Sequence, residues 1–338
     1  MSLWIDIINP SHALFFSSIL KELPDEEVQI TLRERAETVE LSRMLGIEGK
    51  VVGADHSLRV WKSLAMVGRT LSLMSTLDDF DQSLSFENGM SVTVSKVRGK
   101  RSILLCDNDL KFYQKRSYMQ DLETMIKDRA DRIIIPQACL DAFSQHVDQN
   151  IIYTYDGFKE DVYIADYSPD PHFKDSIQFD NYVVLRPEAL SSFYVKELHT
   201  LVPEIIKLFA AEDIKVIYLP RDKGDADFAK GLDAYIPDKA VNGLDLCYHS
   251  MAVLTGSGTM AREAACMGKT SVSFFPSNEL LSVDQRLIDE GKMIHSRDPK
   301  AIVEYVMSRP RPHNRPDLSR SKKVKADVID LIQKSRYN

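Results

Sequence analysis

Short apolar runs alternate along most of the chain with longer stretches in which apolar residues recur every three or four positions. Short apolar runs are typical of buried parallel strands, and the longer pattern is typical of helices that cover a sheet. This alternation predicts an α/β fold. Strands are expected at residues 3–7, 28–32, 50–52, 82–86, 102–106, 132–135, 151–153, 182–185, 215–219, 253–255, 271–275 and 293–295, and helices at 15–23, 36–45, 58–77, 90–97, 117–127, 195–211, 259–267, 283–290 and 299–308.

The alternation is interrupted between residues 157 and 180, where Pro169 and Pro171 stand among several acidic residues. Such a segment is typical of an interdomain linker. We therefore predict two Rossmann-like doubly wound domains, at residues 1–160 and 181–312, that are joined by a linker at 161–180 and face a central cleft. Ligands of doubly wound domains bind outside the carboxyl ends of the strands.

The remaining residues, 313–338, predict a tail helix near 324–333 that packs back on the N-terminal domain. The tail starts rich in proline and basic residues. An alternative for these basic residues is a weak peripheral contact with membrane lipid headgroups. The predicted helix at 58–77 carries apolar residues at Leu64, Val67, Leu71 and Met74.

Composition and charge narrow the class of protein. The length of 338 residues suits two domains, and the net charge of −7 argues against a nucleic-acid binder. Four cysteines without CxxC spacing indicate free thiols in a reducing compartment. The sequence has neither an apolar run of transmembrane length nor a basic signal region, so we expect a cytoplasmic protein.

The most informative segment is 253–276, which predicts a strand, a glycine turn, a helix and a second strand. A helix start presents unpaired amides and the positive end of the helix dipole, and glycines let a phosphate approach that backbone. The segment therefore predicts a seat for the diphosphate of a nucleotide. The residues of this seat are Gly256, Ser257, Gly258 and Thr259.

Glu263 lies one turn beyond Thr259 on the predicted helix and could accept both hydroxyls of a ribose. The alternative is that Glu263 complements the helix dipole or pairs with a nearby base. No Glu or Gln occupies the capping-box position, which favours an external anion. Met260, Ala264 and Met267 share the other face and should pack against the sheet.

Two arginines, Arg186 and Arg221, each end a predicted strand of the C-terminal domain. At the carboxyl ends of strands they suit bidentate binding of a pyrophosphate. Either one has an ordinary surface salt bridge as its alternative role.

The first loop of the N-terminal domain, from Asn9 to His12, follows the first strand. Near a helix N-terminus a histidine stays neutral, which suits a general base or a hydrogen-bond donor, so His12 is a candidate catalytic residue. Asn9 and Ser11 are placed on the acceptor side. The alternatives are a structural histidine and a capping role for Ser11.

Another strand of the same domain leads into Asp107, Asn108 and Asp109. Asp109 is the second candidate catalytic residue, as a base, and Asp107 and Asn108 are placed on the acceptor side; the alternative is a turn and a helix cap. Asp107 and Asp109 have the spacing of a DxD motif, but a metal cage needs more ligands, so no metal is expected.

Several of these segments also carry a resemblance. Residues 4–12 with Phe15 and Phe16, and residues 106–109, 156–160, 184–187, 219–221 and 256–264, follow one another in order over nearly the whole chain. With these segments the chain resembles the domain-of-unknown-function 354 family, found largely in archaea. That family is similar to two-Rossmann-domain glycosyltransferases of type B and to non-hydrolysing UDP-N-acetylglucosamine 2-epimerases.

In both groups a Ser-Gly turn and the following helix hold the diphosphate of the sugar nucleotide, and a glutamate holds the ribose. The resemblance implies these roles for Ser257, Gly258, Thr259 and Glu263. The peptidoglycan N-acetylglucosaminyltransferase has a histidine at the end of its first glycine-rich loop, and His12 is placed similarly.

The sequence also departs from these relatives. The first loop has no glycine-rich run, and Asp109 stands where relatives often have Glu followed by His. The Gly-Thr-Arg-Pro-Glu and His-x-Glu-Ala-Gly-Leu-Arg motifs of the epimerases are absent. Their absence favours a transferase over an epimerase.

The expected function is a metal-independent glycosyltransferase that uses a nucleotide-diphosphate sugar as donor and no further cofactor. The alternatives are a sugar-nucleotide 2-epimerase or hydrolase, and a non-catalytic nucleotide-binding protein of the same fold.

Overall fold

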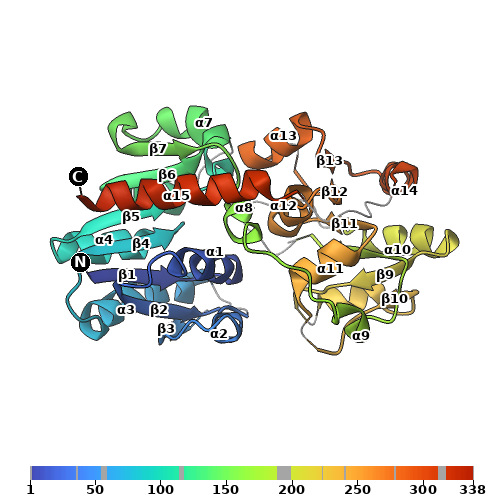
Figure 1. The fold of residues 1–338 in the computed structure, drawn as a ribbon, viewed down its shortest axis with the longest axis horizontal. Helices are drawn as coiled ribbons and strands as arrows, with labels where there is room; N and C mark the ends of the chain where they lie inside the picture. Colours follow the sequence, from blue (N-terminus) through green and yellow to red (C-terminus); the bar gives the residue numbers. More distant parts are fainter. Residues whose placement is uncertain are drawn as a thin grey trace. The chain divides into compact units, whose positions relative to one another are not determined.

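The computed structural model describes residues 2–35, 37–54, 59–113, 118–188, 199–222, 224–239, 241–277, 279–310 and 317–337. The chain forms two compact units (Figure 1). Unit 1 comprises Met1–Tyr163 and Ser321–Asn338, and unit 2 comprises Ile164–Arg320.

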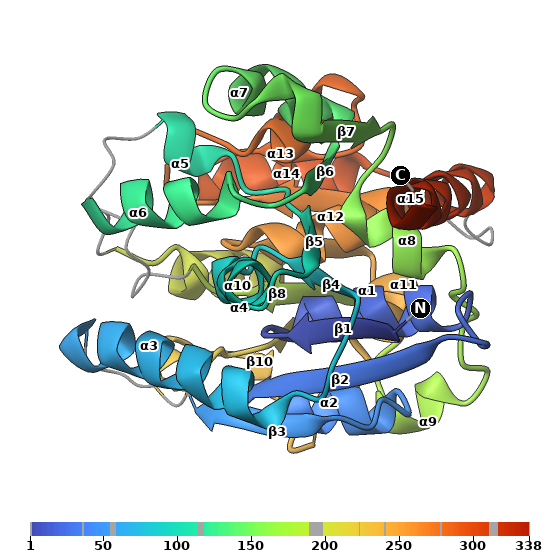
Figure 2. The same ribbon diagram turned by 90° about the vertical axis from the view of Figure 1, so that its left-hand side faces the viewer.

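Unit 1 is built on a seven-stranded parallel sheet with the order β3-β2-β1-β4-β5-β6-β7. Helices α3, α4 and α6 cover one face, and α1, α2 and α15 lie on the other (Figure 2). The strands are β1 (Ser2–Ile7), β2 (Glu27–Glu34), β3 (Lys50–Ala54), β4 (Gln82–Phe86), β5 (Arg101–Leu105), β6 (Arg132–Pro136) and β7 (Ile152–Tyr155). The helices are α1 (Pro10–Leu20), α2 (Thr38–Met44), α3 (Arg59–Thr76), α4 (Gly89–Val97), α5 (Leu110–Tyr113), α6 (Tyr118–Lys127), α7 (Leu140–Ser144), α8 (Lys159–Ile164) and α15 (Ser319–Tyr337).

Unit 2 is built on a six-stranded parallel sheet with the order β10-β9-β8-β11-β12-β13. Helices α10 and α14 pack together on one face, and α12 packs between α11 and α13. The strands are β8 (Tyr182–Arg186), β9 (Lys215–Tyr218), β10 (Ala234–Tyr235), β11 (Ala252–Thr255), β12 (Thr270–Ser273) and β13 (Ile294–His295). The helices are α9 (Phe173–Ser176), α10 (Val202–Ala211), α11 (Gly243–His249), α12 (Gly258–Cys266), α13 (Ser282–Asp289) and α14 (Pro299–Ser308).

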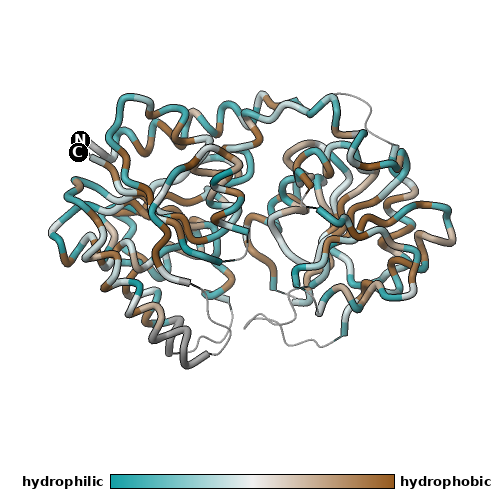
Figure 3. Tube along the Cα trace, turned by 90° about the horizontal axis from the view of Figure 1, so that it is seen from below, coloured by the Kyte–Doolittle hydropathy of each residue, from teal (hydrophilic) through white to brown (hydrophobic). Residues whose placement is uncertain are grey.

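The doubly wound α/β architecture predicted from the sequence is confirmed. Most strand residues are buried because helices cover both faces of each sheet. Figure 3 accordingly shows hydrophobic segments concentrated in the strands of each unit. The two-residue strand β10 and the short helix α7 are not predicted, since both are too short to show a period. The stretch 161–180 contains the end of α8 and helix α9.

Helix α3 buries a different face from the apolar positions that stand out in its sequence. Val67 and Leu71 are each 61% exposed, whereas Arg69 and Leu73 are buried. Leu64 lies outside the side chains that the structure describes. A buried arginine on the face that meets the sheet requires a partner of opposite charge.

That partner is Asp6 on β1, whose carboxylate oxygens accept from Nη1 and Nη2 of Arg69 at 2.8 and 2.7 Å. The Thr31 hydroxyl and the Asn88 amide also donate to Asp6, at 2.6 and 2.7 Å. Removing one partner of such a buried pair leaves an uncompensated charge. Charge pairing rather than apolar period therefore sets which face of α3 meets the sheet.

The C-terminal helix α15 packs on the turn that leads into α8. The Ser321 hydroxyl donates to Asp161 Oδ1 at 2.7 Å, and the Asp161 Oδ2 atom accepts from the amide of Phe158 at 2.9 Å. A Cβ atom on Gly157 would lie 2.3 Å from Val324 Cγ2. Only a glycine at position 157 lets α15 approach this turn so closely.

We expect Gly157→Ala to lower the free energy of unfolding by about 1–3 kcal/mol, because the added methyl group overpacks the contact with Val324. The matched control is Gly68→Ala inside α3, where an added Cβ meets no atom within 4 Å. We expect this control to raise the free energy of unfolding by about 0.5–1 kcal/mol. Urea unfolding of the two variants measures both changes, and equal stabilities would contradict the close packing of α15.

Candidate functional site

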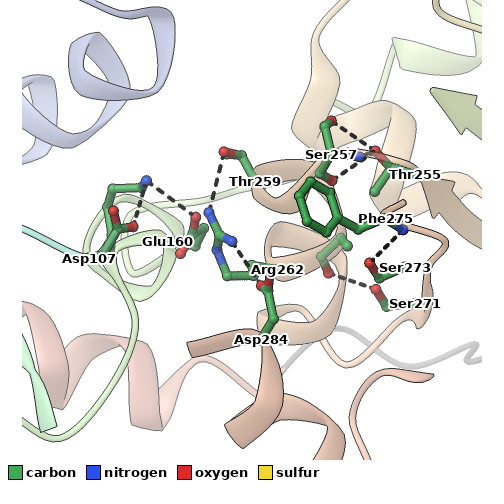
Figure 4. Close-up of polar contacts among 12 residues, drawn as sticks. Asp107, Glu160, Thr255, Ser257, Thr259, Arg262, Ser271, Ser273, Phe275 and Asp284 are labelled. Atoms are coloured by element: carbon green, nitrogen blue, oxygen red, sulfur yellow. Dashed lines mark hydrogen bonds and ion pairs between the residues drawn. The ribbon is translucent and has the colours of Figure 1, made fainter. Parts of the chain in front are cut away.

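The turn between β11 and α12 contains only two residues, Gly256 and Ser257. Ser257 is the cap residue of α12, yet its side chain makes no capping hydrogen bond. Its hydroxyl lies instead 2.9 Å from Thr255 Oγ1, which also accepts from the Ser257 amide at 2.8 Å (Figure 4). The turn therefore fixes its own shape without using the hydroxyl of Ser257 to cap the amides of the first helical turn.

The guanidinium of Arg262 lies against this same first turn. A Cβ atom on Gly258 would be 2.3 Å from Arg262 Nη1, so only glycine leaves room for it. Nη1 donates to Asp284 Oδ1 on α13 at 2.8 Å, and Nη2 is 3.5 Å from Thr259 Oγ1 (Figure 4). The start of α12 thus carries the partial positive charge of its amides and a full positive charge beside them.

The predicted arginine of β8 and the glycine turn are brought together in the sheet. Arg186 pairs with Thr255, and the amide of Gly256 donates to the Arg186 carbonyl at 3.1 Å. A Cβ atom on Gly256 would lie 2.5 Å from the Cα atom of Glu188. Gly256 therefore permits close packing against the chain after β8, a reason independent of any ligand.

Arg221 follows β9, the strand next to β8, and its amide donates to Asp225 Oδ2 at 3.1 Å. Burial raises the pKa of Asp225, while the positive charges of Arg221 and Arg186 act on it in the opposite direction. The two predicted arginines therefore lie near one carboxylate at the carboxyl edge of the sheet.

Glu263 is buried on α12, one turn beyond Thr259. It lies near Cys247 on α11, whose pKa is raised by burial and next by the negative charge of Glu263. Met260 and Ala264 are buried, in agreement with their predicted packing. Glu263 is thus a buried carboxylate one turn beyond Thr259 and close to α11.

In unit 1 the first loop places Asn9, not Ser11, at the cap of α1, because the helix begins at Pro10. The capping role considered for Ser11 is therefore wrong, and Ser11 lies in the first turn. Arg35 Nη1 donates to Asn9 Oδ1 at 2.9 Å, which turns the Asn9 amide nitrogen toward His12 Nε2 at 3.4 Å. Nε2 then accepts, and Nδ1 carries the proton.

His12 is buried, and its ring centroid lies 5.1 Å from that of Phe86. Burial, and next the positive charge of Lys159, lower the pKa of His12 to about 3. The imidazole is therefore uncharged at neutral pH. Its Nδ1 atom has no hydrogen-bond partner among the residues that the structure describes.

The loop after β5 is bound by the side chain of Glu87, a residue with a positive φ of 49°. Glu87 Oε1 accepts from the amides of Asp107 and Asn108 at 3.0 and 2.9 Å, and Oε2 contacts the ammonium of Lys127. Burial alone would raise the pKa of Glu87, but the charges of Lys127 and Lys111, with the hydrogen bonds from Lys127 and the Asn108 amide, together outweigh burial, and the pKa falls to about 2. Glu87 is thus an ionised clamp for this loop.

The two aspartates of the loop have different surroundings. Asp107 is buried and its Oδ2 atom lies 2.9 Å from Lys159 Nζ, which is also 3.7 Å from Glu160 (Figure 4). Asp109 is completely buried. It lies near Cys139, whose pKa is raised by burial and next by the negative charge of Asp109. Asp107 and His12 therefore both lie near Lys159 at the carboxyl edge of the sheet.

Among the described residues no group of three or more His, Cys, Asp or Glu side chains could hold a metal ion. The four cysteines are free thiols. In the part of the chain that the structure describes, no helix has the length and apolar character needed to cross a membrane.

A family model described as Protein of unknown function (DUF354) matches residues 1–337. The chain belongs to this family. A relative in Methanocaldococcus jannaschii, described as an uncharacterized protein, is 25% identical over 316 residues, which are 90% of this chain and 91% of that protein. The predicted resemblance to the DUF354 family is confirmed.

Solved structures show the type of fold that this DUF354 member has. The UDP-GlcNAc 2-epimerase of M. jannaschii, solved in complex with UDP-GlcNAc and UDP, is 14% identical with a TM-score of 0.72 over 98% of this chain and 100% of that chain. The UDP-N-acetylglucosamine 2-epimerase of Rickettsia bellii is 11% identical with a TM-score of 0.73 over 98% and 96%. The glycotransferase of kitacinnamycin is 13% identical with a TM-score of 0.59 over 98% of both chains. The two-Rossmann, type B architecture is thereby confirmed.

The sequence of this DUF354 protein alone does not single out Arg262, Lys159 or Glu87. Arg262 stands within the glycine-turn motif, and only the contact with Gly258 shows its place. Lys159 and Glu87 act through partners 52 and 40 residues away in the chain. The sequence signal for Lys159 is its place in the segment 156–160, one of those that carry the family resemblance.

We expect the stability of this DUF354 protein to fall as the pH drops below 6.5, because the unfolded chain then protonates His12 while the folded chain keeps it neutral down to about pH 3. The contribution of His12 is complete above pH 6.5 and decreases by about 1.4 kcal/mol per pH unit below it. Urea unfolding between pH 5 and 8 measures this slope.

The control for this slope is His12→Asn, which has no group that titrates in this range. In the wild type, His12 should contribute about 2 kcal/mol to the decrease in unfolding free energy from pH 6.5 to pH 5, and in the variant this contribution should be absent. An identical pH slope in wild type and variant would show that His12 is not held neutral.

Proposed function

We propose that this protein is an enzyme that acts on a nucleotide-diphosphate sugar, with the first turn of α12 as the seat of the diphosphate. The observation that carries this proposal is the Arg262 guanidinium packed against Gly258 at the start of α12. The amide end of a helix and a guanidinium at one point attract an anion, and Asp284 Oδ1 already accepts from Arg262 at 2.8 Å.

The reaction that we propose is metal-independent glycosyl transfer. When the bond between the sugar and the diphosphate breaks, negative charge grows on the departing diphosphate. The helix amides, Arg262, and the arginines of β8 and β9 supply fixed positive charge there, and preorganised charge of this kind stabilises a transition state. The pairing of β8 with β9, the strands that Arg186 ends and Arg221 follows, supports this role.

Glu263 is proposed to bind the two ribose hydroxyls of the nucleotide. Its carboxylate is an acceptor-only group when ionised, and two neighbouring hydroxyls donate to such a group well. A buried position one turn from the diphosphate seat is consistent with this role.

Unit 1 is proposed to handle the acceptor. A pKa of about 3 makes His12 a weak base at neutral pH, so we assign it the role of an uncharged hydrogen-bonding partner of the acceptor hydroxyl. The hydroxyl proton is proposed to pass to a carboxylate of the loop after β5, which carries Asp107 and Asp109. Asn9, Ser11 and Asn108 are proposed as further contacts of the acceptor.

A second candidate function is a sugar-nucleotide 2-epimerase or hydrolase. The observation in its favour is the likeness of the whole chain to two UDP-N-acetylglucosamine 2-epimerase structures, at TM-scores of 0.72 and 0.73. Such an enzyme needs no acceptor. Incubation with UDP-N-acetylglucosamine alone should then yield its 2-epimer or free UDP, whereas a transferase leaves the compound unchanged until an acceptor is added.

We expect a nucleotide sugar to raise the melting temperature of the wild type by mass action, by about 5 °C or more at 100 times its Kd. In Glu263→Ala and Glu263→Gln the Kd should rise about tenfold or more, because the ribose loses its charged hydrogen-bond acceptor. The measurement is a thermal-shift titration with UDP-, GDP- and dTDP-sugars.

The matched control is Glu304→Ala, which removes an exposed glutamate from α14 of the same unit. It should bind the ligand as the wild type does. The proposal fails if no nucleotide sugar binds the wild type at millimolar concentration, or if the Glu263 variants bind as tightly as the control.

A further inference from the structure

Lys159 is a buried cation at the carboxyl edge of the sheet of unit 1, where no role is assigned to it above. Its ammonium lies 2.9 Å from Asp107 Oδ2 and 3.7 Å from Glu160 Oε1. It also lies 5.1 Å from the ring centroid of Phe86, and the His12 ring centroid is 5.1 Å from the same point. The ammonium and the imidazole thus contact the same aromatic ring.

The backbone around Lys159 is fixed by an element from the far end of the chain. Asp161 accepts from the Phe158 amide and from the Ser321 hydroxyl of α15. Gly157 packs directly on Val324 of the same helix. The first turn of α8 therefore has little freedom, and the Lys159 side chain extends from a rigid base.

Stability alone gives little reason for this buried pair. Taking a lysine and an aspartate out of water costs free energy that their mutual attraction only offsets, so a well-packed apolar pair often does as well. The placement of the Lys159–Asp107 pair beside His12 therefore directs attention to a role other than stability.

We propose that Lys159 is a positioning residue of the acceptor side, which holds the Asp107 carboxylate and the His12 imidazole in the arrangement that receives the acceptor hydroxyl. This inference rests on the proposed function. Lys159 itself touches neither the donor nor the reacting atoms. It fixes Asp107 by direct contact and acts on His12 through its charge.

The effect on His12 is electrostatic and shared with other groups. A positive charge nearby disfavours a second positive charge on the imidazole, so Lys159 helps to keep His12 neutral. Beside Lys159 on α8, the charged groups that act on His12 are Glu87 after β4, Arg35 after β2 and Lys127 on α6. Only Glu87 favours the protonated imidazole, and its charge is already compensated by Lys127.

The test compares Lys159→Met and Lys159→Arg with the control Lys96→Met, which removes a half-exposed ammonium 2.7 Å from Asp131. The titration of His12 is followed by NMR of protein labelled with 15N-histidine, and His12→Asn assigns its signal. Lys159→Met should raise the pKa of His12 by about one to two units. Lys159→Arg keeps the charge and should stay near the wild type, as should Lys96→Met.

A second arm of the test measures binding with UDP-N-acetylglucosamine as the probe. Lys159→Met should bind the probe within threefold of the wild type, because the proposed donor seat lies in unit 2.

An unchanged His12 titration in a folded Lys159→Met variant, or a loss of probe binding in that variant, overturns the inference. If the wild type binds no nucleotide sugar, the proposed function fails, and the His12 titration alone decides whether Lys159 sets the state of this cluster. A raised pKa of His12 in Lys159→Met, with Lys96→Met unchanged, supports the inference.

Discussion

Two positively charged groups lie close together at the start of α12: the amide end of the helix, which carries a partial positive charge, and the guanidinium of Arg262. Such an arrangement is unfavourable unless negative charge is supplied nearby, and within unit 2 Asp284 supplies one carboxylate at 2.8 Å. The absence of a side chain at Gly258 is what lets the guanidinium come so close. The proposed diphosphate seat depends on these two positive groups at the start of α12, and the proposed ribose role of Glu263 depends on the seat.

Unit 1 handles buried charge in the opposite way, by matching each charged group with a partner. Glu87 has Lys127 and two backbone amides, and Asp107 has Lys159. The result is a rigid edge of the sheet on which His12 is neutral. A site of this kind suits an uncharged hydroxyl better than a second anion, because a neutral ligand leaves the existing pairs in place.

Much of the fold follows from the sequence, since short apolar runs between amphipathic stretches have few explanations other than parallel strands and covering helices. The glycine turn at 256–258 is predictable for the same local reason. Long-range charge pairing is not local, and it accounts for the main differences. Asp6 draws Arg69 inward and leaves Val67 and Leu71 exposed, and Lys159 reaches a partner 52 residues away. Asn9 replaces Ser11 as the cap because Pro10 already begins the helix.

The most direct measurement of the central claim is an NMR titration of 15N-labelled protein with UDP, followed at the backbone amides of α12. The account predicts that the amide signals of Gly258, Thr259 and Met260 shift together and saturate, because these amides bind the diphosphate. Saturable binding of UDP that moves other amides and leaves these three unchanged would contradict it.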